Sequence, residues 1–150
     1  PTLDEVFQAM GRRLFINVEL KSVDLVSDGL ELAVSELIQR HQMQDHVIVS
    51  SFNPLALMRF ARLMPDVPRA YLYAQGMPFL ARYLLFVTDS TAQHPEHVLI
   101  DERYMDWARQ HGYAVNIWTV NEPDEARRLR DLGVNGIITD APDTILSALG

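Results

Sequence analysis

The 150-residue sequence contains no cysteine, which excludes disulfide bonds and thiolate metal sites. It has no run of about twenty apolar residues and no signal-peptide pattern, so we expect no membrane span. Basic residues are in the minority: 13 Lys and Arg against 20 Asp and Glu give a net charge of −7, which argues against a nucleic-acid-binding surface. The missing cysteines do not identify the compartment, and we expect a soluble protein, with a cytoplasmic location preferred.

The length and composition are those of an ordinary globular protein. A hydrophobic content of 48% and a charged content of 22% predict a single domain, residues 1–150, with a core of its own. The sequence opens on Pro1 rather than Met, from which we expect a processed chain or a piece of a longer one.

Apolar segments of strand length alternate with segments of helical character. The strand candidates are Leu14–Leu20, His46–Phe52, Arg69–Ala74, Thr91–His94, Ala114–Val120 and Gly136–Asp140. The helix candidates are Leu30–His41, Pro54–Leu63, Pro78–Phe86, Asp101–His111, Glu122–Leu132 and Asp143–Leu149, after an opening helix with a capping box formed by Thr2 and Glu5. This alternation predicts an α/β fold with a parallel sheet.

Single residues predict several boundaries of these elements. Asn121 is a good N-cap for the helix that follows it, and Asp140 is a candidate N-cap for the last helix. Gly112 and Gly133 stand where glycines that end helices are expected. Gly136 predicts a close backbone approach in the last strand.

Two arrangements of such a sheet are possible, an open doubly wound sheet and a barrel. No glycine-rich dinucleotide loop follows any strand candidate, which weakens the doubly wound alternative. Polar residues gather where each strand passes to its helix, and TIM-type barrels build their active sites at that end. A complete barrel needs about 200–250 residues, so we predict a partial TIM-type (β/α) barrel of about six parallel strand–helix units. Its open edges predict a homo-oligomer that covers them.

The first strand candidate carries a carboxylate and an ammonium group near its carboxyl end. Alternation along the strand places Asn17, Glu19 and Lys21 on one face. Such a pair suits a site for a metal and an anion, with Glu19 as an oxygen ligand and Lys21 as the anion contact. A structural ion pair between Glu19 and Lys21 is the alternative.

Two further residues are candidates at other strand ends. Alternation groups Trp118 with Asn116 and Val120, so Trp118 either lines a pocket or fills the core. His94 is the histidine best placed for acid–base chemistry, although a structural role for it is the more common outcome.

Several motifs resemble the glycerophosphodiester phosphodiesterase family in order and spacing. They are Pro1–Phe7 (PTLDEVF), Ile16–Lys21 (INVELK), Ser51-Phe52-Asn53, His94-Pro95, Val115–Asn121 (VNIWTVN) and Gly133–Pro142 (GVNGIITDAP). Each motif is weak alone, but their joint occurrence in the family's order covers nearly the whole chain.

The resemblance implies a (β/α)8 barrel that hydrolyses glycerophosphodiesters to an alcohol and glycerol phosphate with a divalent cation, Mg²⁺ or Ca²⁺. By the same resemblance Glu19 is a metal ligand and Lys21 contacts the phosphate. Phe52 and Trp118 match aromatic positions near the glycerol pocket. The implied partner is therefore a glycerophosphodiester or another small phosphate-type molecule.

The sequence departs from the family pattern in one respect. The family's His-Arg pair, Glu-x-Asp metal pair and second His-Asp belong to its first two strands and have no match here. We therefore assign no catalytic histidine, and we expect the isolated chain to be nearly inactive and to bind no divalent cation by itself. The alternative function is a non-catalytic, oligomeric partial barrel that binds a phosphate-type anion.

Overall fold

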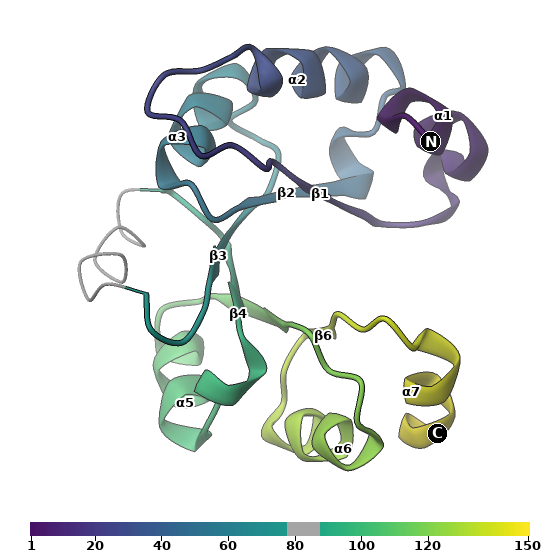
Figure 1. Cartoon of the computed structure of the whole chain (residues 1–150), viewed down its shortest axis with the longest axis vertical. Helices are drawn as coiled ribbons and strands as arrows, with labels where there is room; N and C mark the ends of the chain where they lie inside the picture. The colour runs from purple at the N-terminus through teal and green to yellow at the C-terminus, as the bar shows by residue number, and fades with distance from the viewer. Residues whose placement is uncertain (78–87) are drawn as a thin grey trace. The chain divides into compact units, whose positions relative to one another are not determined.

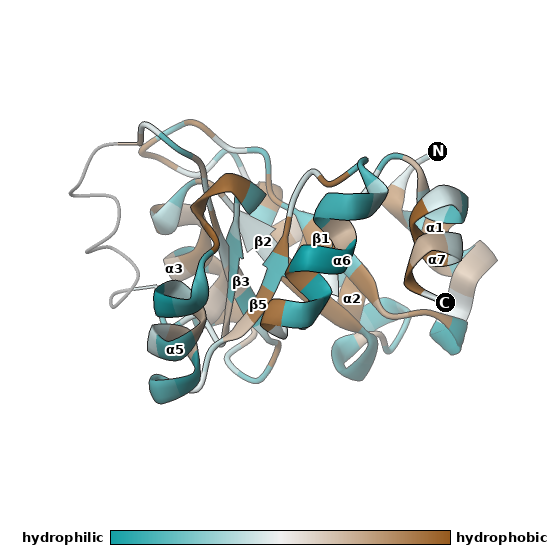
Figure 2. Cartoon of the chain, turned by 90° about the horizontal axis from the view of Figure 1, so that it is seen from below, coloured by the Kyte–Doolittle hydropathy of each residue, from teal (hydrophilic) through white to brown (hydrophobic). Residues whose placement is uncertain are grey.

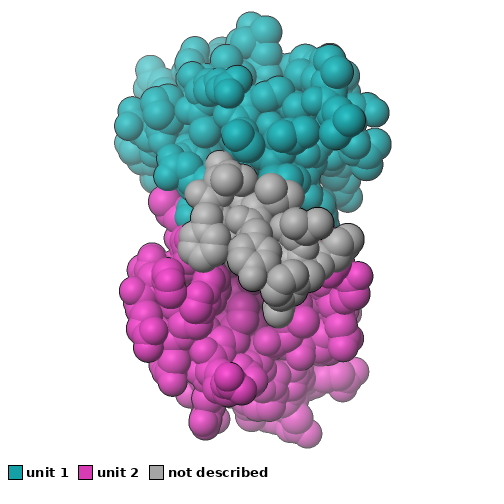
Figure 3. Space-filling view, turned by 90° about the vertical axis from the view of Figure 1, so that its left-hand side faces the viewer, with its two compact units in different colours: residues 1–71, 82–90 teal, residues 72–81, 91–150 magenta. Residues whose placement is uncertain are grey.

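The computed structural model describes residues 1–77 and 88–150, which form two compact units (Figures 1 and 3). Among the described residues, unit 1 contains 1–71 and 88–90, and unit 2 contains 72–77 and 91–150. Each unit is described by itself. The helix predicted at Pro78–Phe86 lies outside the described residues.

Strands and helices alternate through both units, as the sequence predicts. Unit 1 contains α1 (Leu3–Met10), β1 (Ile16–Glu19), α2 (Leu30–Arg40), β2 (Val47–Ser51) and α3 (Pro54–Leu63), and β3 (Arg69–Tyr73) contributes to both units. Unit 2 contains β4 (Ala92–Pro95), α5 (Glu102–Gln110), β5 (Ala114–Ile117), α6 (Pro123–Leu132), β6 (Gly136–Ile137) and α7 (Pro142–Leu149).

The strands lie in the sheet in the same order as in the sequence, β1-β2-β3-β4-β5-β6. The pairs β1–β2, β2–β3, β4–β5 and β5–β6 are parallel. A doubly wound sheet reverses its strand order at a switch point, so the strictly sequential order excludes that alternative. The fold is an α/β partial barrel of the TIM type, as predicted.

Each unit has its own apolar core. In unit 1, α2 and α3 lie side by side (Figure 1), and Ile38 and Phe60 from these helices pack with Val18 and Val49 of the strands. The pairing of Val18 with Val49 sets the register that also pairs Glu19 with Ser50.

The core of unit 2 gathers residues from α5, β5, α6 and α7. Met105, Val115, Leu129 and Ile145 are all buried there. α6 is mostly hydrophilic (Figure 2), and only Ala126 and Leu129 of its residues are buried. Its arginines therefore face solvent while its small apolar stripe packs on β5 and α7.

Several predicted helix boundaries are confirmed. The Thr2 hydroxyl accepts a hydrogen bond from the Glu5 amide at 3.3 Å, and the Glu5 carboxylate accepts one from the Thr2 amide at 2.8 Å, which completes the capping box. Helix α3 has the predicted bounds because Asn53 caps it and Pro54 occupies its first position. Gly133 ends α6 with a φ of 84°.

Other boundaries differ from the predictions. Helix α6 has Glu122 as its N-cap, because the Asn121 side chain instead binds Thr139 and Asp140 across the sheet edge. Asp140 is likewise not a cap, since Ala141 precedes α7. Both predictions were wrong because a local capping preference lost to contacts between residues about 20 positions apart.

The strand alternation also ends earlier than predicted at β5. The strand stops at Ile117, and Val120 is buried in the same core cluster as Val115 and Ile117. Val120 therefore does not share a face with Asn116 and Trp118. The prediction extended a period of two into a segment that has already left the strand.

Arg69, at the start of β3, fixes the turn between α3 and β3. Its side chain is only 3% exposed, and its Nη1 donates to the carbonyls of Met64, Pro65 and Val67 at 3.3, 3.0 and 2.7 Å. Its Nη2 donates to the Asp89 carbonyl and carboxylate, both at 3.1 Å. One guanidinium thus satisfies most carbonyl acceptors of the turn.

Candidate functional site

Glu19 and Lys21 lie at the carboxyl end of β1, and both are exposed. Leu20 between them is 1% exposed, and its amide donates to the Ser50 carbonyl at 2.7 Å. The buried Leu20 directs its two neighbours to the opposite, solvent-facing side, as alternation predicts.

The ion-pair alternative for these residues is not supported. Glu19 and Lys21 form no ion pair with each other, and neither has a recorded partner among the described residues. Lys21 is also the only lysine in the sequence, alongside twelve arginines. A single exposed ammonium group without a neighbouring carboxylate partner is free to contact an anion.

The carboxyl end of β2 lies directly beside this pair. The Ser51 hydroxyl donates to the Leu20 carbonyl at 2.7 Å and accepts from the Asn53 amide at 3.0 Å. Phe52, between Ser51 and Asn53, is 40% exposed. The structure therefore places Glu19, Lys21 and Phe52 at the ends of two adjacent parallel strands of unit 1.

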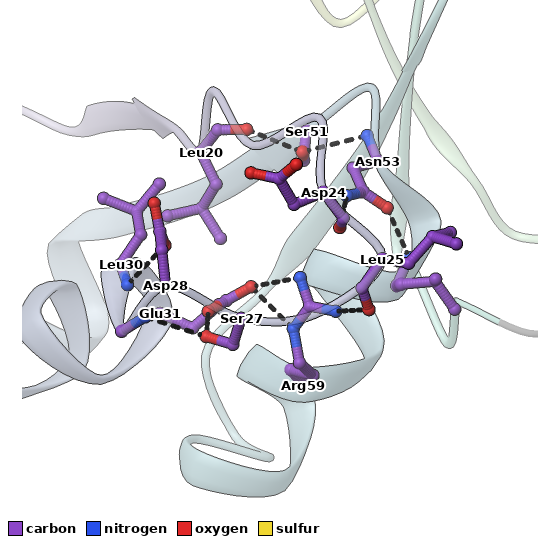
Figure 4. A network of polar contacts seen from close by, with 12 residues as sticks. Leu20, Asp24, Leu25, Ser27, Asp28, Leu30, Glu31, Ser51, Asn53 and Arg59 are labelled. Atoms are coloured by element: carbon purple, nitrogen blue, oxygen red, sulfur yellow. Dashed lines mark hydrogen bonds and ion pairs between the residues drawn. The ribbon is translucent and has the colours of Figure 1, made fainter.

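The segment 22–29 connects β1 to α2 and follows Lys21 at the same strand end (Figure 4). The sequence reasoning did not select this segment. A signal was present, because Val23, Leu25 and Val26 are apolar residues that fit neither helical nor strand periodicity. All three are exposed, although the side chains of Asn53 and Arg59 hold the backbone of the segment.

A buried ion pair anchors this segment. Glu31 is 2% exposed, and its Oε1 lies 2.7 Å from Arg59 Nη2 and accepts a hydrogen bond from Arg59 Nε at 2.8 Å. The Ser27 hydroxyl donates to the other carboxylate oxygen. Burial raises the pKa of the Glu31 carboxyl, but hydrogen bonds from Ser27, the backbone and Arg59, with the charge of Arg59, together lower it below its usual value. Glu31 is therefore ionised at neutral pH.

Trp118 belongs to unit 2, where it follows β5. It is half-buried, and its indole nitrogen donates to the His94 carbonyl at 2.7 Å. Asn116 contacts the His94 ring at 2.9 Å through its side-chain amide. Gly136 leaves room for that amide, since a Cβ there would lie 2.6 Å from the Asn116 side-chain oxygen. The predicted close approach at Gly136 is thus to a side chain rather than to backbone.

His94 has the environment of a structural histidine. It is 1% exposed, and burial lowers its pKa to about 4, so the ring is neutral near pH 7. His41 lies 2.8 Å from an Asp4 carboxylate oxygen, and His97 lies 2.9 Å from Glu125. These three histidines are engaged within their own units.

The described residues do not by themselves form a metal site. Within residues 1–77 and 88–150, no group of three or more His, Cys, Asp and Glu side chains converges as a cation would require. Glu19 supplies one exposed carboxylate, whereas Mg²⁺ and Ca²⁺ take six or more ligands, with waters completing the set. Glu19 fits the role of one ligand in a larger set.

In the described part of the chain, no helix combines the length and the hydrophobicity needed to span a bilayer.

The sequential parallel sheet defines a protein of the TIM-barrel class, and proteins of this class build their sites at the carboxyl ends of the strands, where the polar groups of this chain lie. The comparisons then identify the family. The model of the glycerophosphoryl diester phosphodiesterase family matches residues 1–144, so the chain belongs to that family.

Relatives and solved structures agree with this assignment. The chain is 29% identical over 150 residues to a glycerophosphodiester phosphodiesterase of Caldanaerobacter subterraneus subsp. tengcongensis, and 31% identical over 147 residues to one of Bacillus altitudinis. These alignments cover 98% and 95% of the chain but 60% of each relative, so the chain spans about three-fifths of their length.

One similar solved structure contains a bound reaction product. The chain is similar to an Oleispira antarctica phosphodiesterase solved in complex with the product sn-glycerol-3-phosphate, with a TM-score of 0.84 and 28% sequence identity. The alignment covers 99% of this chain and 61% of that one.

Proposed function

We propose that this chain contributes to the hydrolysis of glycerophosphodiesters to an alcohol and glycerol phosphate. The observation that carries the proposal is the exposed pair Glu19 and Lys21, unpaired with each other at the carboxyl end of β1. Family membership and the relatives' printed activity support the substrate class.

Lys21 would contact the phosphate oxygens, because an exposed ammonium group attracts a phosphodiester and the negative charge that builds on it. Glu19 would supply one ligand to the divalent cation that the family implies, and that cation would polarise the phosphoryl oxygens. Phe52, at the adjacent strand end of unit 1, would contact the glycerol moiety. The role that the resemblance implies for Trp118 stays a prediction.

The 150 residues alone would turn over such substrates very slowly. Phosphodiester hydrolysis needs a base for the attacking water and an acid for the leaving oxygen. His94 is buried and neutral, and His41 and His97 are bound to carboxylates. None of these is a free acid–base group, so we expect phosphate binding to be measurable where hydrolysis is not.

The unique lysine gives a direct test. With sn-glycerol 3-phosphate as the probe, ligand should protect Lys21 from acylation, which peptide mass spectrometry measures against the Pro1 amine as internal reference. Lys21→Met should weaken calorimetric binding of the probe about tenfold, a loss of about 1.4 kcal/mol. Arg62→Met removes the same charge from an exposed position on α3 and should bind like the wild type. Equal loss in both variants would show only a net-charge effect and would contradict the assigned role.

A second candidate is a non-catalytic module that assembles through its sheet edges. Among the described strands, β1 and β6 are the ends of the sheet, and open edges promote pairing with another copy. Beside β6, unit 2 has a groove of about 400 Å³ lined by apolar residues that include Val134, Ile137, Pro142, Ile145, Leu146 and Leu149.

This second candidate predicts a homo-oligomer in sedimentation velocity. Leu146→Glu, at a side chain that is 68% exposed in the groove, should dissociate that oligomer and make the unfolding temperature independent of protein concentration. Leu63→Glu on α3, at a side chain that is 41% exposed, is the matched control. A monomeric wild type would refute the assembly role.

A further inference from the structure

Three aliphatic side chains project into solvent immediately after the proposed phosphate-binding lysine. Val23, Leu25 and Val26 are 93%, 81% and 79% exposed. Scattered apolar residues are ordinary on protein surfaces, but three within four residues form a patch that suggests a binding partner.

The patch belongs to an ordered segment (Figure 4). The Asn53 amide donates to the Asp24 carbonyl at 3.0 Å, and Arg59 donates to the Leu25 carbonyl at 3.1 Å. Because polar contacts hold the backbone at both residues, the aliphatic side chains stay outside the core. Their exposure is therefore part of the folded arrangement of this segment.

The patch begins close to a cation. Val23 is two positions after Lys21 in the sequence, so their Cα atoms lie within about 7 Å of each other. A positive charge beside an aliphatic surface matches a molecule that carries a phosphate and a hydrocarbon chain only a few bonds apart. The chain's net charge of −7 argues against a membrane rich in anionic lipid as the partner.

We propose that Val23, Leu25 and Val26 bind the acyl chain of a single-chain glycerophosphodiester, so that this site accepts lysophospholipids. The inference rests on the proposed phosphodiester function and specifies its substrate. The phosphate lies at Lys21, and the acyl chain lies along segment 22–29.

The test compares two ligands that share a headgroup. They are glycerophosphocholine, which has no acyl chain, and 1-octanoyl-lysophosphatidylcholine kept below its micellar concentration. Calorimetry on the wild-type chain should show at least tenfold tighter binding of the octanoyl compound, a difference of about 1.4 kcal/mol that corresponds to about two buried methylene groups.

Three variants separate the contributions. Val23→Ser with Leu25→Ser and Val26→Ser should abolish the preference and leave glycerophosphocholine binding unchanged, whereas Lys21→Met should weaken both ligands by the same factor. Leu14→Ser with Phe15→Ser is the matched control, because these exposed residues precede β1 at its opposite end. Circular dichroism melts check that each variant folds, and Leu25→Ser alone should lose part of the preference.

Each other outcome counts against the inference. Equal wild-type affinity for the two ligands would overturn the acyl-chain site while leaving the phosphodiester function intact. Binding of neither ligand would overturn both. Loss of phosphatidylcholine vesicle binding in the triple variant, with unchanged octanoyl affinity, would assign the patch to a bilayer surface. Conversion of an oligomer to a monomer by the same variant, again with unchanged octanoyl affinity, would assign it to a second copy of the chain.

Discussion

Arg59→Met should destabilise the protein by about 3 kcal/mol, because it leaves the Glu31 carboxylate buried without its cation. Removing one partner of a buried pair typically costs about 3–5 kcal/mol. The lower end applies here, since the Arg59 side chain is 21% exposed and water can partly replace it. Methionine keeps much of the arginine stem, so the loss reports charge and hydrogen bonding rather than volume.

Urea unfolding followed by far-ultraviolet circular dichroism measures this effect. Tryptophan emission is less suitable because Trp107 and Trp118 both lie in unit 2, whereas the pair lies in unit 1. With a denaturant slope of about 2 kcal/mol/M, the midpoint should fall by about 1.5 M. Arg59→Met combined with Glu31→Gln should recover part of the loss, since the uncompensated charge is then gone.

The pH dependence provides an independent check on the same pair. The pKa of Glu31 is lowered in the folded protein from the ordinary value of 4.5, so its stabilisation is present above about pH 4.5 and is lost as pH falls through the folded-state pKa. Glu31→Gln should flatten the stability profile in that range. A midpoint for Arg59→Met within about 0.3 M of the wild type, or a double variant less stable than the single one, would refute the reasoning.

Three smaller predictions concern other parts of the fold. Gly136→Ala should lower the free energy of unfolding by about 1–3 kcal/mol in urea titrations, because its Cβ would displace the Asn116 amide; Gly76→Ala, at a φ of 82° with open space around it, reports backbone strain alone. The hydrogen bond from Arg128 is the main cause that lowers the pKa of Glu125 to about 2. Glu125→Gln should therefore reduce the pH dependence of the stability of unit 2 between about pH 4.5 and 2, and an unchanged pH profile would contradict this. Thr2→Ala should cost about 1 kcal/mol through loss of the capping box, whereas Thr2→Ser should restore it, and hydrogen exchange of the first turn of α1 distinguishes the two.

The sequence predicted those parts of the fold in which short-range chemistry and packing agree. The bounds of α3 were predicted because Asn53 and Pro54 favour the same helix start that the buried face requires. The shared face of Glu19 and Lys21 was predicted because a period of two places both opposite the apolar Leu20, which is buried in the structure.

The remaining features depend on contacts that no local pattern encodes. Asn121 has the residue type of a cap, but its amide binds Asp140 and Thr139, which are distant in sequence. For His94 the sequence left both an acid–base role and the more common structural role open, because sequence does not show burial, and burial sets the pKa of this residue. The exposure of Val23 depends on the Arg59 and Asn53 contacts that hold its segment, and those arise only in the folded unit.

The conformation of the turn between α3 and β3 depends mainly on hydrogen bonds from one side chain. Arg69 donates to three carbonyls between Met64 and Val67 and to Asp89 beyond them. Most constraints on this connection are therefore concentrated at a single position, while exposed residues within it, such as Pro65 and Asp66, are left comparatively free to vary. Lysine cannot replace Arg69, because its single ammonium nitrogen cannot contact both the three carbonyls that bind Nη1 and the Asp89 oxygens that bind Nη2. The connection into β3 should therefore tolerate substitutions at most of its positions but not at Arg69.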